Sequence, residues 1–103
     1  MNVSLNNLGT VNKNKVTLVT EQHELQIYFS YEIPVSFSIR NRTAQADDGQ
    51  FTDVTRVNDW GRTTGKFLNE LEPDKKKRVD GSVFTVLLMA AIARVTEGLS
   101  ITT

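Results

Sequence analysis

The stretch with the clearest chemical pattern is WGRTTGKFLNEL, residues Trp60 to Leu71. Its two glycines, Gly61 and Gly65, and the following Lys66 are typical of a phosphate-binding loop. Such a loop needs four residues between its glycines and a Ser or Thr after its lysine, because the backbone ring cradles a phosphate and the hydroxyl holds magnesium. Here only three residues separate the glycines, and Phe67 follows the lysine. The spacing therefore excludes a nucleotide-hydrolysing loop.

Two interpretations of this stretch remain. In the structural one, Thr63 or Thr64 caps a short helix over Thr64 to Leu71, which buries Phe67 and ends before Pro73. In the functional one, the free N–H groups at the helix start bind a phosphate or carboxylate without hydrolysis. The candidate anion-binding residues are Arg62, Thr63, Thr64 and Lys66.

A second candidate is the basic cluster between the two expected helices. A short charged connection of this kind is typical of a solvated loop. Alternatively it contacts nucleic-acid phosphates, with Tyr28 as a stacking platform; Tyr31 lies on the apolar side of its strand and is expected in the core. The cluster consists of Lys75, Lys76, Lys77 and Arg78, and the wider basic segment begins at Arg56.

The side chains available for catalysis are few. The chain has no cysteine and a single histidine, His23, which stands at the start of an expected strand. A metal site or a nucleophile with its base normally needs more imidazole, thiolate or carboxylate groups at a defined spacing. We therefore expect no catalytic residues, no metal site and no cofactor.

Composition limits the other classes. At 103 residues the chain predicts a single domain over 1–103, and twelve basic against twelve acidic residues exclude a global field for nucleic acid. The start of the chain does not resemble a secretory signal, and the longest apolar run, Val83 to Ala93, is shorter than the roughly 20 residues of a membrane span. These features favour a cytoplasmic protein without membrane contact.

The elements that must position these residues begin with a long alternating run. From His23 to Ile39 the odd positions are mostly apolar and the even ones mostly polar, which is typical of strands with one wet face. One strand of this length would span roughly 55 Å, so we expect a bend near Pro34 between strands over Glu24 to Phe29 and Val35 to Arg40. Because both halves keep the same parity, the connection must be of odd length or contain a bulge.

Further strands are expected on both sides of this hairpin. Lys15 to Val19 is β-branched, and Gln50 to Val57 follows a polar loop with the turn signal Asp48-Gly49. The asparagine-rich residues 1–14 fit either an edge strand or a loose arm. The pattern predicts an antiparallel meander of three or four strands.

The C-terminal segment changes to a helical period. A helix over about Ser82 to Glu97, capped by Asp80 or Ser82 and ended by Gly98, is apolar around most of its girth. One face is expected on the sheet, and the other meets either the short helix or a second copy of the protein. The fold class is thus α+β, a meander with a short helix and a C-terminal helix packed on one face. The expected oligomer interface comprises Val86, Met89, Ala90 and Ala93.

Three segments together carry a resemblance: FSYEIPVSF at 29–37, WGRTTGKFLNEL, and KKKRVDGSVF. They resemble a family of short, uncharacterised proteins from bacteriophages and metagenomes, with the patterns F-S-Y-x-x-P-V and W-x-x-T-T-x-K-x-x-N, over roughly Leu25 to Leu88. This chain departs from that pattern at Ile33, Gly61 and Phe67, where relatives have Thr, Ser and His. The resemblance implies a phage or mobile-element origin, a host cytoplasm and an accessory role, but no mechanism.

The function we expect is that of a small accessory protein that acts by binding and not by catalysis. The expected partner is either a second copy of the chain, in a homo-oligomer that is foremost a dimer, or a host protein that the chain inhibits. The first alternative is a nucleic-acid-binding protein that uses basic residues between 56 and 78. The second is a protein that sequesters a small anionic ligand at the RTTGK helix start.

Overall fold

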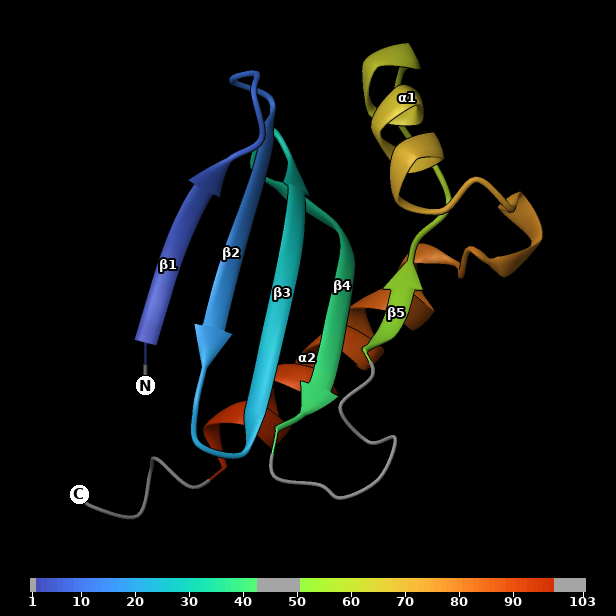
Figure 1. The fold of residues 1–103 in the computed structure, drawn as a ribbon. Coiled ribbons are helices and arrows are strands. Elements are labelled where there is room, and N and C mark those ends of the chain that lie inside the picture. Colours follow the sequence, from blue (N-terminus) through green and yellow to red (C-terminus); the bar gives the residue numbers. More distant parts are fainter. Residues whose placement is uncertain (1, 43–50, 98–103) are drawn as a thin grey trace.

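The computed structural model describes residues 2–42 and 51–97, which form five strands, two α-helices and one short 3₁₀ helix (Figure 1). The turn predicted at Asp48-Gly49 and the helix end predicted at Gly98 lie outside the described residues. The elements are β1 (Asn2–Asn7), β2 (Lys13–Val19), β3 (His23–Ser30), β4 (Ile33–Asn41), β5 (Thr52–Thr55), α1 (Arg62–Leu71), η1 (Lys75–Lys77) and α2 (Gly81–Thr96).

The strands form one antiparallel sheet in chain order, β1-β2-β3-β4-β5. The α+β class is confirmed, but the predicted three or four strands were too few because the asparagine-rich start is the edge strand β1 and not a loose arm. Val3 stands opposite Leu18 and Leu5 opposite Val16, so β1 continues the apolar rows of its neighbour.

The expected bulge is present in the β3–β4 hairpin. Tyr28 pairs with Ser36 but Phe29 pairs with Pro34, so Val35 is the extra residue of β4. The turn itself is the two-residue connection at 31 and 32. A two-residue turn alone would exchange the two faces of β4, and the bulge restores the apolar parity, which confirms the parity argument.

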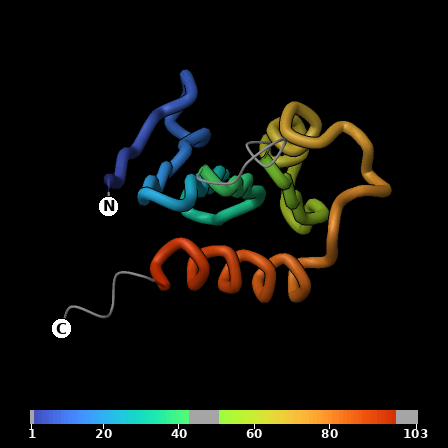
Figure 2. The backbone as a smooth tube through the Cα atoms, turned by 60° about the horizontal axis from the view of Figure 1, so that its bottom comes forward, coloured from blue at the N-terminus to red at the C-terminus, as the bar shows by residue number. Residues whose placement is uncertain are grey.

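Helix α2 lies across one face of the sheet (Figures 1 and 2). Its buried side chains pack on the apolar row of β3 and β4, and the ring of Phe84 lies 5.7 Å from that of Phe37. Asp80 caps the helix by accepting a hydrogen bond from the Ser82 N–H, as one of the two predictions had it. The buried residues of this core are Leu25, Ile27, Phe37, Phe84, Leu88, Ala91 and Val95.

Helix α1 lies on the opposite side of the sheet from α2, so the alternative in which the short helix meets the other face of the C-terminal helix was wrong (Figure 2). Phe67 and Leu68 form a second, smaller cluster with Val35, and Tyr28 packs against it. Tyr28 follows Ile27, which belongs to the α2 core, and neighbouring strand residues point to opposite faces. The bulge also delivers Val35 to the α1 side, which explains why this small cluster forms there.

The outer face of α2 is therefore not covered by α1. Its apolar side chains remain exposed, with 67% of Val86 and 65% of Met89 accessible. Ala90 and Ala93, the other two residues of the predicted interface, are exposed as well. Val83 and Leu87, which had not been assigned to that interface, are also exposed.

Candidate functional site

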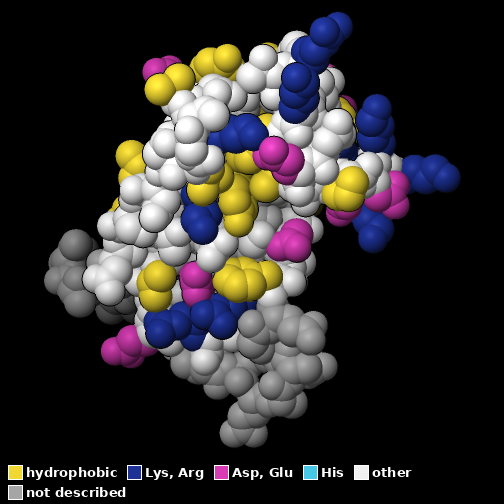
Figure 3. Space-filling view, turned by 45° about the horizontal axis from the view of Figure 1, so that its top comes forward, with side chains coloured by type: hydrophobic (Ala, Val, Ile, Leu, Met, Phe, Trp, Pro, Cys, Tyr) yellow, Lys and Arg dark blue, Asp and Glu magenta, His cyan; other side chains and the backbone are white. Residues whose placement is uncertain are grey.

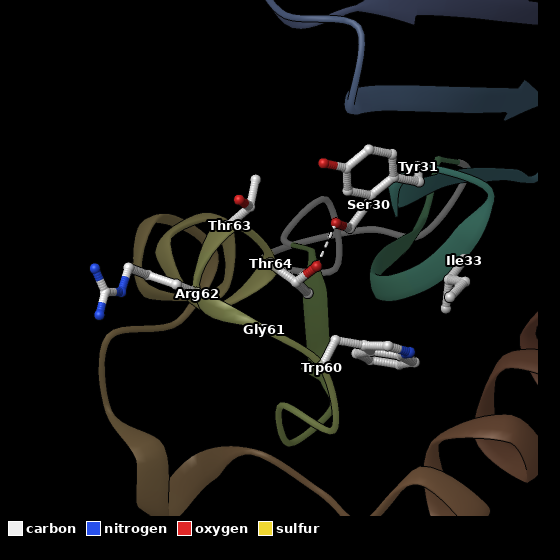
Figure 4. Close-up of a pocket in the computed structure, with 8 residues that line it drawn as sticks. All are labelled: Ser30, Tyr31, Ile33, Trp60, Gly61, Arg62, Thr63 and Thr64. Atoms are coloured by element: carbon white, nitrogen blue, oxygen red, sulfur yellow. Dashed lines mark hydrogen bonds between the residues drawn. The ribbon is translucent and has the colours of Figure 1, made fainter.

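The two most distinctive sequence segments meet at one corner of the molecule. The β3–β4 turn, from FSYEIPVSF, lies beside the start of α1, from WGRTTGKFLNEL, and a cavity of about 240 Å³ opens between them (Figure 4). Sequence patterns found Tyr31 and the helix start but missed Ser30 and Ile33, although both belong to the first segment. The lining residues are Ser30, Tyr31, Ile33, Trp60, Gly61, Arg62, Thr63 and Thr64.

A buried pair of hydroxyl groups holds this corner together. The Ser30 and Thr64 hydroxyls lie 2.8 Å apart, and both side chains are almost fully buried. Thr64 is therefore not a helix cap, and neither is Thr63: α1 begins at Arg62, and its N-cap is Gly61, without a side-chain hydrogen bond. The prediction of a threonine cap was wrong because the threonine hydroxyl is used in a tertiary contact across the two segments.

The first turn of α1 has free backbone donors. The Gly65 N–H donates to the Gly61 carbonyl at 3.1 Å, whereas the N–H groups of residues 62–64 make no hydrogen bond to any described residue. The charged side chains do not converge on these donors. Figure 4 shows the Arg62 guanidinium pointing away from the other labelled residues, and Lys66 is exposed but does not line the cavity. The geometry thus joins Arg62, Thr63 and Thr64 but leaves Lys66 outside.

Two aromatic side chains stand at this cavity. Tyr31 is 57% exposed, so the prediction that it lies in the core was wrong. It occupies the turn with a φ of 57°, an uncommon value for a residue other than glycine, and its N–H donates to the Asn12 carbonyl. Trp60 is partly exposed beneath it. Residues held in this backbone region often belong to functional surfaces.

The Arg56 side chain is held by contacts within the protein. Its guanidinium pairs with Asp59 and lies 4.4 Å from the Trp60 ring centre. It also packs against the first residue of α2, because a Cβ added to Gly81 would collide with the Arg56 guanidinium. Because the side chain is engaged on all these sides, its expected role in contacting nucleic acid is not supported.

The basic cluster divides into structural and free residues. Arg78 donates to the Glu72 carbonyl and to Asn69 Oδ1, and so fastens the connection to α1. The three lysines Lys75, Lys76 and Lys77 form the exposed helix η1, capped by Asp74. Figure 3 shows several Lys and Arg side chains projecting from the side of the molecule that carries α1. Lys75, Lys76, Lys77, Arg62 and Lys66 make no ion pair with any described residue.

Glu24 and Arg40 form an ion pair on the sheet. Glu24 accepts from Gln26 and from Arg40, whose Nη2 lies 2.7 Å from Oε1, and these contacts hold the pKa of Glu24 below its usual value. Burial, together with the nearby Asp53 charge, raises the pKa of Tyr28. Across 2–42 and 51–97, no three His, Asp or Glu side chains gather in a group that could hold a metal ion.

Comparisons with protein-family models, with curated proteins and with solved structures give no match to this chain. Of the helices in the described part of the chain, neither has the length and apolar character needed to span a membrane. The fold and the surfaces therefore define an α+β domain with three exposed features. These are the outer face of α2, the corner cavity at Tyr31 and Trp60, and the free lysines of η1.

Proposed function

We propose that this protein is a non-catalytic binding protein that works as a homodimer through the outer face of α2. The observation that carries the proposal is the exposed apolar surface of that helix, formed by Val83, Val86, Leu87 and Met89. Apolar side chains gathered in this way on one helix are typical of a protein–protein contact. Ala90 and Ala93 lie on the same face and let a second backbone approach closely.

A second copy of the chain suits this face better than an unrelated partner. The outer face has no charged side chain from Gly81 to Ala93, so two copies meet without repulsion. It also alternates larger and smaller residues. In an antiparallel two-fold pairing of the helices, Val86 of one copy lies over Ala93 of the other, and Met89 and Ala90 lie near the axis. The helix, at sixteen residues, is about 24 Å long and offers a continuous contact.

Sedimentation velocity from low to high micromolar concentration tests this proposal. The unmodified chain is expected to associate as its concentration rises, and Met89→Glu to sediment at a smaller mass, because a charge buried at the axis is costly. Thr52→Glu is the matched control, since it places the same side chain at an exposed position of β5. A monomer at every concentration for the unmodified chain, or equal dissociation by the control, would contradict the proposal.

A second function rests on the free cations of α1 and η1. Five exposed Lys and Arg residues without ion pairs in the described chain lie on these two helices, and the exposed rings of Tyr31 and Trp60 stand near the start of α1. Exposed cations and exposed rings are the usual elements of single-strand nucleic-acid binding. We therefore propose this as the alternative to a purely protein-binding role.

The alternative is tested with a labelled single-stranded oligonucleotide. Anisotropy should report binding that weakens strongly between about 50 and 200 mM salt. Replacing Lys75, Lys76 and Lys77 by alanine should reduce the salt slope, and Tyr31→Ala should lower affinity with the slope unchanged. Absence of binding at low salt would dismiss this function and leave the proposed dimer untouched.

A further inference from the structure

The outer edge of β1 is an unpaired strand edge. Every residue of this six-residue strand is exposed, and β2 alone pairs with it within the described sheet. The Leu8 N–H donates to the Lys13 carbonyl, which fixes the side of the ladder that each residue faces. The backbone N–H and C=O groups alternate in direction along an antiparallel strand. Those of Ser4 and Asn6 therefore point toward β2, and those of Val3 and Leu5 point outward.

This edge has none of the features that usually prevent strands from pairing with other molecules. Residues 2–7 include no charged residue and no proline, and the pairing of β1 with β2 is regular from Asn2 to Asn7. The opposite edge differs. Strand β5 has only four residues, and Arg56 directly after it is bridged to Val79, which covers that edge. Only the β1 edge is therefore an open template for a further strand in the described sheet.

The side chains of β1 show which face a further strand would extend. Val3 and Leu5 lie in the same rows as Leu18 and Val16, on the α2 side of the sheet. They are 62% and 71% exposed, so α2 does not reach over them. The even positions of β1, Asn2, Ser4 and Asn6, are polar and face the other side. Another strand with the same alternation would match this edge on both faces.

We infer that β1 pairs antiparallel with β1 of a second copy across a two-fold axis at Ser4, so that the two sheets become one. In this register Val3 lies opposite the partner's Leu5, and Ser4 lies opposite the partner's Ser4. The outward backbone groups of Val3 and Leu5 then form the hydrogen-bonded pairs. The apolar side chains meet on the α2 face, and Asn2 meets the partner's Asn6 on the polar face.

Uncharged strands favour a second copy as the occupant of this edge. Since residues 2–7 have no charge, the self-pairing brings no like charges together. The surface is separate from the outer face of α2, so this inference does not depend on the proposed helix-mediated dimer. If both contacts form, each is isologous, and together they build an assembly larger than a dimer. Each contact can be removed by a substitution that leaves the other intact.

A disulfide trap tests the strand pairing, because the chain has no cysteine of its own. Residues opposite each other in a non-hydrogen-bonded antiparallel pair have Cα atoms about 4.5 Å apart, within the roughly 4.4–6.8 Å range of disulfides. The Ser4→Cys chain, with Met89→Glu to remove the helix contact, should therefore oxidise to a linked dimer. Glu21→Cys in the same background is the control, at an exposed turn position, and should form no covalently linked dimer.

Blocking the edge completes the test. Leu5→Lys places a charge on the exposed edge, where it is compatible with folding. It should lower the yield of linked dimer from the Ser4→Cys chain by at least several-fold. Circular dichroism confirms that each variant is folded. Failure of Ser4→Cys to link above the Glu21→Cys control, or linkage that persists with Leu5→Lys, would overturn the inference. A smaller mass for Met89→Glu than for the unmodified chain reports only on the helix contact, whereas linkage of the Ser4→Cys chain reports on the strand pairing.

Discussion

Two neighbouring residues of α2, Leu88 and Met89, should respond to truncation in opposite ways. Leu88 is only 8% exposed and belongs to the core on the sheet, whereas Met89 is 65% exposed on the outer face. Leu88→Ala removes buried methyl groups and leaves a cavity, which costs about 2–5 kcal/mol of folding free energy. Met89→Ala removes no buried contact within one chain and should change that free energy by less than about 0.5 kcal/mol.

These energies correspond to large differences in melting temperature. For a domain of about this size, each 1 kcal/mol changes the melting temperature by roughly 4–8 °C. Leu88→Ala should therefore melt at least about 8 °C below the unmodified chain, while Met89→Ala stays within about 4 °C. A dimer adds stability that depends on concentration. At high protein concentration Met89→Ala should lose the part of that stability that the helix contact adds, and Leu88→Ala should retain it.

The assay is thermal and urea unfolding followed by circular dichroism at several protein concentrations. The dilute samples report folding of one chain, and the change with concentration reports association. Equal destabilisation by both variants at dilution would refute the assignment of Met89 to an outer face. An unfolding temperature that does not depend on concentration in the unmodified chain would refute the association through this helix.

Other predictions concern the corner and the sheet. Ser30→Ala and Thr64→Ala should each destabilise the fold, and a double-mutant cycle should give a coupling of about 1 kcal/mol; additivity would show that their hydrogen bond contributes nothing. The pKa of Glu24 is lowered from its ordinary value of 4.5, so its carboxylate stabilises the fold at pH values above 4.5. This stabilisation is lost as the pH falls through the lower pKa of the folded state. Glu24→Gln should flatten that acid decline in urea titrations, and an unchanged slope would count against the ion pair. Tyr31→Asn should relax the positive φ and raise the melting temperature by a few degrees, and a lower melting temperature would show that the backbone strain is not the dominant effect there.

The sheet was largely predictable, because the alternation of apolar and polar residues along a strand reflects which face of the sheet is exposed to solvent. The parity of residues 23–39 required either a connection of odd length or a bulge, and the structure shows the bulge at Val35. Strand β1 was left undecided, since asparagine is uncommon in strands and gives little local preference. Its pairing comes from Val3 and Leu5 joining the apolar rows of β2, a tertiary effect that no local pattern contains.

The corner site was predictable in its residues but not in its geometry. The pattern identified Thr63 and Thr64, but cap preferences assigned them to the helix start, whereas a tertiary hydrogen bond to Ser30 fixes Thr64 instead. The side of the sheet that α1 occupies was also missed. The position of α1 depends on the bulge, which places Val35 on the polar face of the sheet. The alternating pattern can indicate that a bulge exists, but it does not identify the residue that the bulge displaces.

Native mass spectrometry of the Leu5→Lys chain most directly tests the central claim, because this variant blocks the β1 edge and leaves α2 unchanged. The account predicts a species at twice the 11.6 kDa chain mass at low micromolar concentration. The same chain with Met89→Glu added should show the single-chain mass. A single-chain mass for Leu5→Lys itself would contradict the proposal that the outer face of α2 joins two copies.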